Sequence, residues 1–277
     1  MLFFKRILNF KRDAMARLRD KRRARRYPVG PGFALKASVN LAGIDDPARI
    51  ATTPVGLGRE WAGHLSNLSS GGVSVQLPPA AMTLRGERTV VKLALEHHRL
   101  EIPCVVAHFR VLNSVALCGL SLKFPDFTAQ KAYLQLLAAV RLGSSFEAGP
   151  ARRGRHNPAG TVREEYQAEN RTRLTAWRDT SSRELHSFEL MLDDHCLRGR
   201  ADSPTLDVYT RQRENKTAPA AVSAPTHRLS TGTHAEVRQL FRWVVPNIGK
   251  PVPSDLRAFL QRFAHARTDW RPPTAPP

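Results

Sequence analysis

Three strand-like segments follow one another in residues 88–124, which read RTVVKLALEHHRLEIPCVVAHFRVLNSVALCGLSLKF. Each segment, at 88–96, 100–111 and 116–124, consists of alternating apolar and polar residues or of β-branched residues. This period of two is typical of a strand with one buried face. Charged residues, asparagine and serine separate the segments and favour turns. Because no helix lies between them, we expect antiparallel pairing.

The same pattern extends upstream. Three further strand-like segments are GFALKASVNL (32–41), EWAGHLSNLS (60–69) and GGVSVQLP (71–78). About six strands in succession predict an antiparallel barrel or sandwich rather than a parallel sheet. Residues 41–58 are longer than an ordinary hairpin connection, so we interpret them as an insertion.

A helix and a linker follow the last strand. Residues 125–143, PDFTAQKAYLQLLAAVRLG, carry apolar side chains mainly on one face and predict a helix that packs on the barrel. Residues 146–160 are rich in glycine, proline and arginine, as at a domain boundary. We therefore place the barrel domain at 21–142 and a linker at 143–160.

Residues 161–266 are predicted to form an α+β domain of unknown function. Strand-like alternation recurs at 171–178, 184–194, 196–201 and 205–211, and two amphipathic helices are expected at 234–249 and 253–267. Residues 267–277 are expected to be a disordered tail. The predicted fold class is β-rich with two domains, a six-stranded antiparallel barrel with a C-terminal helix followed by an α+β domain.

The chain is strongly basic, and the charge is concentrated at its start. The formal net charge is +19, and residues 1–26 hold 11 Lys or Arg against two Asp. Such a balance predicts attraction to phosphate groups. Residues 1–20 are predicted to be a basic amphipathic helix. Two interpretations stay open: a peripheral contact with an anionic membrane, or a helix that docks on the protein or frays in solvent.

Several functional classes are disfavoured. The chain lacks an apolar run of about 18 residues, and Lys5 and Arg6 interrupt the first apolar patch, so we expect a soluble cytoplasmic protein, peripheral to the inner membrane if the helix binds lipid. The three cysteines show no CxxC spacing, and neither His97-His98 nor residues 193–196 show paired metal-ligand spacing. No GxSxG, P-loop or GxGxxG motif is present. We expect no metal, no cofactor and no catalysis.

Two short motifs carry the functional hypothesis. The first is RRARR at 22–26, an RxxxR pattern whose guanidinium groups suit a ligand with several phosphates. The second is NLSSGG at 67–72, in which short polar side chains and glycines allow close approach of a ligand. Taken separately, the first is also explained as a solvated charge run and the second as an ordinary β-turn.

In this order, the two motifs resemble the PilZ domain family. RRARRYPV is similar to the family's arm before strand one, NLSSGGVSVQL to its (D/N)xSxxG signature, and CGLSLKF to its closing strand. The resemblance covers about residues 21–142. It implies a barrel that binds the bacterial second messenger cyclic di-GMP, with contacts from Arg22, Arg26, Asn67, Ser69 and Gly72. Arg23 and Arg25 are secondary candidates within the same arm.

The resulting hypothesis is a bacterial cyclic di-GMP receptor that acts without chemistry. We expect the C-terminal domain to pass the signal to an unidentified protein partner. Two alternatives remain: a degenerate PilZ-like scaffold that no longer binds nucleotide, and a general polyanion binder. The polyanion in the second alternative is nucleic acid or acidic lipid, and nucleic acid is not an expected partner.

Overall fold

A computed structural model of the chain describes residue 4 and residues 25–43, 58–149, 160–169, 172–210 and 231–265. The chain divides into two compact units, Met1–Ser144 and Ser145–Pro277. Four predicted features lie wholly or mostly outside the described residues: the helix at 1–20 except Phe4, most of the insertion at 41–58, the linker residues 150–159, and the tail at 267–277.

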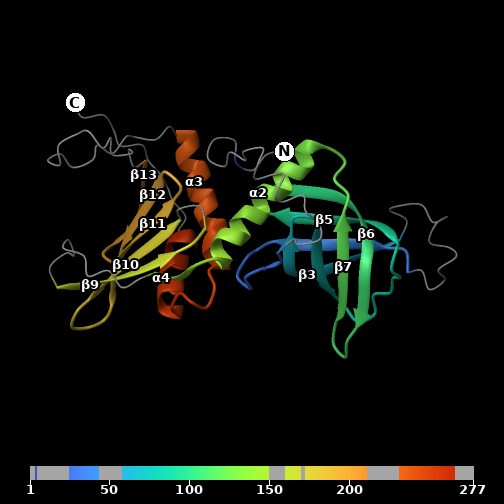
Figure 1. The fold of residues 1–277 in the computed structure, drawn as a ribbon, viewed down its shortest axis with the longest axis horizontal. Helices are drawn as coiled ribbons and strands as arrows, with labels where there is room; N and C mark the ends of the chain where they lie inside the picture. The colour runs from blue at the N-terminus through green and yellow to red at the C-terminus, as the bar shows by residue number, and fades with distance from the viewer. Residues whose placement is uncertain are drawn as a thin grey trace. The chain divides into compact units, whose positions relative to one another are not determined.

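The first unit is an antiparallel β-barrel (Figure 1). Its strands are β1 (Tyr27–Pro28), β2 (Lys36–Leu41), β3 (Arg59–Ser69), β4 (Gly72–Leu77), β5 (Arg88–Leu95), β6 (His98–Val111) and β7 (Ala116–Leu122). Hydrogen-bonded neighbours run in the order β1-β3-β2-β5-β6-β7-β4. Because β3 also pairs with β4, the six strands from β2 through β7 form a closed ring. The predicted six-stranded antiparallel barrel is confirmed, with the short strand β1 added beside β3.

Alternate residues of the strands fill the barrel interior. In β5, Thr89, Val91, Leu93 and Leu95 are each at most 3% exposed, whereas the residues between them are half-buried. This alternation is the period of two on which the sequence prediction rests. Burying such side chains stabilises the fold by about 25 cal/mol for each Å² of apolar surface that leaves water.

Helix α2 (Phe127–Ser144) packs against β1, β3 and β6 of the barrel. It begins after Asp126, whose carboxylate accepts a hydrogen bond from the Ala129 N–H at 2.8 Å and so satisfies a donor that the first turn leaves unpaired. The buried Gln135 amide holds the backbone of Phe4. The Phe4 N–H donates to Gln135 Oε1 at 3.1 Å, and Gln135 Nε2 donates to the Phe4 carbonyl at 2.5 Å. These bonds attach a residue near the chain start to the helix.

The second unit is an antiparallel sheet with two helices on one face (Figure 1). Its strands are β8 (Glu147–Ala148), β9 (Thr161–Gln167), β10 (Arg173–Asp179), β11 (Leu185–Leu192), β12 (His195–Arg200) and β13 (Ser203–Thr210). The strands pair in chain order, and α3 (Thr231–Val244), the 3-10 turn η2 (Val245–Asn247) and α4 (Ser254–His265) follow them. The predicted α+β architecture is confirmed.

Strand β9 was not predicted from the sequence, and its contacts explain why. Its middle residues are charged, and they form ion pairs instead of an apolar stripe. Arg163 pairs with Glu165 at 2.7 Å, and Glu164 pairs with Arg178 of β10 at 2.9 Å. A search for apolar alternation cannot detect a strand that is held by charge pairs.

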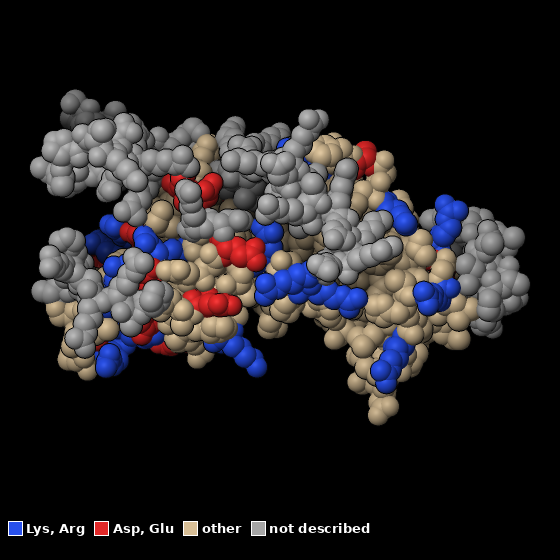
Figure 2. Space-filling view, in the orientation of Figure 1, with Lys and Arg blue, Asp and Glu red and all other residues tan. Residues whose placement is uncertain are grey.

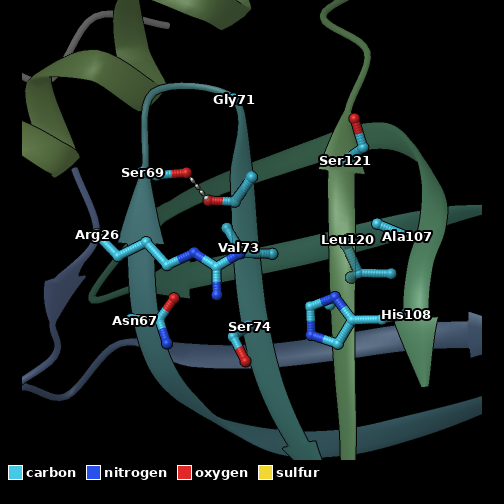
Figure 3. A pocket seen from close by; sticks show the side chains of 12 residues that line it. Arg26, Asn67, Ser69, Gly71, Val73, Ser74, Ala107, His108, Leu120 and Ser121 are labelled. Carbon is cyan, nitrogen blue, oxygen red and sulfur yellow. Dashed lines mark hydrogen bonds between the residues drawn. The ribbon is translucent and has the colours of Figure 1, made fainter. Parts of the chain in front are cut away.

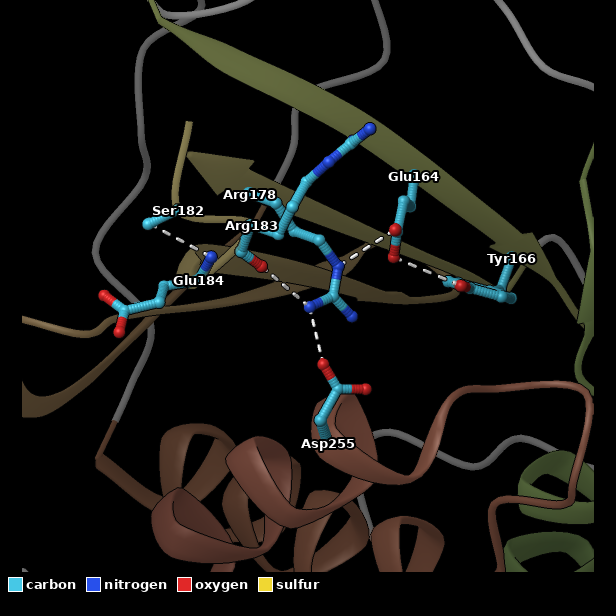
Figure 4. Close-up of polar contacts among 7 residues, drawn as sticks. All are labelled: Glu164, Tyr166, Arg178, Ser182, Arg183, Glu184 and Asp255. Carbon is cyan, nitrogen blue, oxygen red and sulfur yellow. Dashed lines mark hydrogen bonds and ion pairs between the residues drawn. The ribbon is translucent and has the colours of Figure 1, made fainter. Parts of the chain in front are cut away.

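Arg178 connects the sheet to α4 (Figure 4). Its Nε donates to Glu164, and its Nη1 donates to Asp255 at 2.5 Å and to the Arg183 carbonyl at 3.2 Å. The hydrogen bond from Arg178 lowers the pKa of Asp255 below its ordinary value. The guanidinium group therefore satisfies acceptors on β9, on the β10–β11 turn and at the start of α4.

The described surface of the two units differs in charge (Figure 2). Among the charged residues visible on the face shown, those of the barrel unit are mostly Lys and Arg, whereas those of the C-terminal unit are of both signs. Among the described residues, no helix combines the length and apolar character that a membrane crossing requires.

Candidate functional site

The β3–β4 turn is held in a defined shape by three kinds of contact. Ser69 and Gly72 pair across the turn, and Ser69 Oγ donates to the Gly72 carbonyl at 3.1 Å. Tyr133 of α2 donates its hydroxyl to the Ser69 carbonyl at 2.7 Å and reaches the Gly72 carbonyl at 3.2 Å. The Leu122 N–H of β7 donates to the Gly71 carbonyl at 2.9 Å. The turn is therefore fixed by both the barrel and the helix.

Gly72 is required by a close approach of two strands. A Cβ atom at this position would lie 2.7 Å from the Leu120 carbonyl oxygen, closer than real side chains come to backbone. Any other residue would push β4 away from β7 at the base of the turn. The glycine thus serves strand packing as well as the candidate site.

A β-bulge sets the direction of Asn67. The β3–β4 register shifts between Leu65 and Asn67, so that Leu65 faces Val75 while Asn67 faces Ser74. Leu65 and Leu68 are both buried in the barrel, three positions apart, which regular alternation does not allow. The extra residue, Ser66, turns Asn67 out of the interior and onto the outer face of the barrel.

The outer face carries an open pocket of about 270 Å³, here called the barrel pocket (Figure 3). Four of the predicted site residues line it: Arg26, Asn67, Ser69 and Gly72. Figure 3 shows the Arg26 side chain reaching across β3 between Ser69 and Asn67. Tyr27 and Pro28, which follow Arg26, pair with Leu68 and Asn67 of β3, so the end of the arginine arm is attached beside the turn.

The remaining arm residues are placed differently. Arg25 does not line the barrel pocket, and its guanidinium group instead lies 5.6 Å from the centre of the Tyr27 ring. Arg22 and Arg23 lie outside the described residues. Of the seven predicted residues, the structure brings four together in one pocket.

Sequence reasoning missed three polar residues of the barrel pocket: Ser74 of β4, His108 of β6 and Ser121 of β7. Ser74 and Ser121 occupy ordinary strand positions, and His108 follows an irregularity that no composition signal marks. They reach the pocket because the barrel closes β4 onto β7 and pairs β6 with β7. The sequence signal that was available for Ser74 is its place in the strand directly after the turn.

The electrostatics of the barrel pocket favour an anion. Arg26 is the one permanently charged side chain among the described residues that line it, and no Asp or Glu is among them. The hydroxyl groups of Ser69 and Ser121 and the Asn67 amide add neutral hydrogen-bonding groups. Complete burial raises the pKa of Tyr133, so its hydroxyl keeps its proton and remains a donor to the turn.

Within the described part of the chain, no group of three or more His, Cys, Asp or Glu is arranged to hold a metal ion. Cys104, Cys118 and Cys196 are buried free thiols, and burial raises the pKa of each to about 12. At neutral pH they are protonated.

Replacing Tyr133 by phenylalanine tests the contact between helix and turn. The variant removes the hydroxyl that donates to the buried side of the turn at the Ser69 carbonyl, and we expect the free energy of unfolding to fall by about 1 to 3 kcal/mol. Urea unfolding of the full chain measures the change. Tyr27→Phe is the matched control, because the described residues offer the Tyr27 hydroxyl no hydrogen bond. Equal stability of the two variants contradicts the expectation.

Comparison with known proteins bears on the first unit. Residues 20–139 match the family model of the PilZ domain. Among solved structures, the PilZ domain with c-di-GMP of YcgR from Escherichia coli is similar over 40% of this chain and 85% of that chain, at 12% identity and a TM-score of 0.30. No curated protein matches the chain.

Proposed function

Because residues 20–139 form a PilZ domain, the family that binds cyclic di-GMP, we propose that this protein is a cyclic di-GMP receptor and that the barrel pocket is its ligand site. The observation that carries the proposal is the convergence of Arg26 with Asn67, Ser69 and Gly72 in one pocket without an acidic side chain. These residues belong to the two motifs on which the resemblance to the family rests.

The chemistry of the ligand suits these groups. Cyclic di-GMP carries two phosphates and two guanine bases. A guanidinium group binds a phosphate through two parallel hydrogen bonds and also stacks on a base, which a lysine cannot do equally well. In this proposal Arg26 holds a phosphate, Asn67 and Ser69 donate or accept hydrogen bonds beside it, and Gly72 leaves room for the ligand. Arg22, and secondarily Arg23 and Arg25, contribute further positive charge from the arm.

The output is assigned to the C-terminal unit. We propose that ligand binding at the arginine arm and the turn is passed on to the second unit, and that this unit passes the signal to a protein partner. The support is architectural: a separate compact unit follows α2 directly, and α2 contacts the β3–β4 turn through Tyr133. The protein acts as a binding protein without a catalytic step in this proposal.

The charge of residues 1–26 favours a second candidate, a general binder of polyanions. The two candidates differ in their salt response. Binding driven by many phosphate contacts falls by orders of magnitude over a modest rise in salt and ignores the base, whereas a nucleotide pocket selects guanine and loses less affinity.

Thermal unfolding with nucleotides tests the proposed function. Cyclic di-GMP at a hundredfold excess over its dissociation constant is expected to stabilise the protein by about 2.7 kcal/mol, which raises the melting temperature measurably. GTP and cyclic di-AMP at the same concentration serve as controls, at physiological salt. The absence of a shift contradicts the proposed receptor function and supports a scaffold that no longer binds nucleotide. An equal shift with all three nucleotides also contradicts it and supports a general polyanion binder.

A further inference from the structure

Four residues form a continuous row across the outer face of the barrel. Asn67 of β3 lies opposite Ser74 of β4, Ser74 lies opposite Gly119 of β7, and Gly119 lies opposite His108 of β6. All four line the barrel pocket. Asn67, a predicted ligand residue, occupies one end of this row, and His108 occupies the other.

His108 points outward because of a bulge. From His98 to Val106 the even-numbered residues of β6 are buried in the barrel, and continued alternation would turn His108 inward as well. The register with β7 shifts between Val106 and His108, and both Ala107 and His108 are exposed. The same kind of irregularity directs Asn67 outward at the other end of the row. Two independent bulges therefore turn two polar side chains into one pocket.

The imidazole ring of His108 lies flat over Gly119. A Cβ atom built at Gly119 would overlap the ring, nearest to Cε1, with both ring nitrogens only slightly farther away. This pattern places the built atom above the ring face, because an atom in the ring plane beyond Cε1 would lie much farther from the nitrogens. Figure 3 shows the ring over β7, at the side of the pocket opposite Arg26. One face of the ring thus covers the glycine, and the other is exposed to the pocket.

An exposed, flat aromatic face beside an arginine matches the two parts of a nucleotide. Phosphate binds to the guanidinium group, and a purine base stacks on a ring that is already held parallel to the surface. We propose that His108 is a stacking platform for one guanine base of the bound dinucleotide, and that Gly119 is the residue that lets the ring lie flat. This inference rests on the proposed function of the barrel pocket and adds a ligand residue that neither sequence motif contains.

Equilibrium titration of the full chain with cyclic di-GMP tests the platform. His108→Ala is expected to raise the dissociation constant by roughly 5- to 150-fold, the range of one lost base–aromatic stack. His108→Phe keeps a flat ring and is expected to bind within about threefold of the original protein. Gly119→Ala displaces the ring and is expected to weaken binding as His108→Ala does. His64→Ala is the control, because His64 is an exposed histidine of β3 outside the pocket.

The outcomes separate this inference from the proposed function. If the unaltered protein binds cyclic di-GMP and His108→Ala binds it equally well, the proposed stacking role of His108 is wrong and the proposed receptor function is unaffected. If His108→Phe loses as much affinity as His108→Ala, the ring does not act by stacking, and the platform is again overturned. If the unaltered protein does not bind cyclic di-GMP, the proposed function fails and the platform fails with it. Melting without ligand verifies that each variant is folded.

Discussion

Replacing Arg26 by alanine is expected to raise the dissociation constant for cyclic di-GMP by about 10- to 150-fold. The estimate follows from the loss of charge-assisted hydrogen bonds, which contribute about 1.5 to 3 kcal/mol. Arg26 is the one permanently charged side chain among the described lining residues, so none of the others described there replaces it. Isothermal titration of the full chain measures the change.

Two further variants show whether position or charge alone matters. Arg26→Lys keeps the charge but loses the fork-shaped donor, and we expect an affinity between those of the unaltered protein and Arg26→Ala. Arg99→Ala removes the same charge from an exposed position on β6 that does not line the barrel pocket. Its affinity is expected to be unchanged. Equal losses for Arg26→Ala and Arg99→Ala would favour the general polyanion binder over the receptor.

Replacing Phe188 by alanine is expected to destabilise the C-terminal unit by about 3 to 5 kcal/mol. Phe188 of β11 is fully buried at the centre of an aromatic cluster. The centre of its ring lies 6.0 Å from the ring centre of Phe241 in α3. The ring centres of Phe259 and Phe263, both in α4, lie 5.9 and 5.2 Å away. The variant leaves a cavity between β11, α3 and α4, so the loss of stability includes the packing contacts that join these three elements. Thermal unfolding followed by near-ultraviolet circular dichroism measures it.

The same variant tests whether ligand binding resides in the first unit. The barrel pocket is built from residues of Met1–Ser144 alone. We therefore expect Phe188→Ala to bind cyclic di-GMP with unchanged affinity at a temperature where the barrel is folded. Leu185→Ala, a half-buried position at the start of β11, is the control and is expected to cost less stability. Loss of cyclic di-GMP binding together with the C-terminal fold contradicts this assignment.

The strands of the barrel were predictable because their signal is local. In β5 and β6 most inward residues are apolar, and charged residues such as Lys92, Arg99 and Glu101 lie between them, so the period is visible without knowledge of the partner strands. Strand β9 lacks this signal because its middle residues are charged. Arg163 and Glu164 form ion pairs with Glu165 and Arg178 in place of apolar contacts. Strand β1 has two residues, too short for any period.

The candidate site was predictable only in part. Asn67, Ser69 and Gly72 lie close together in the sequence, on either side of the β3–β4 turn, and the residue types around a turn reflect its local backbone geometry. Arg26 could be named only through the resemblance to a family, since an arginine run by itself has no single partner. Arg25 belongs to the same run, yet the structure places it against Tyr27 rather than in the pocket.

The sequence by itself determined the elements and the turn, because hydrophobic period and turn chemistry act over a few neighbouring residues. The tertiary structure alone decided which side chains share the barrel pocket. Strand closure sets Ser74 beside Gly119, and one extra residue in β6 reverses the direction of His108. Neither event changes the local composition, since a one-residue shift exchanges the inner and outer faces of a strand without altering its residues.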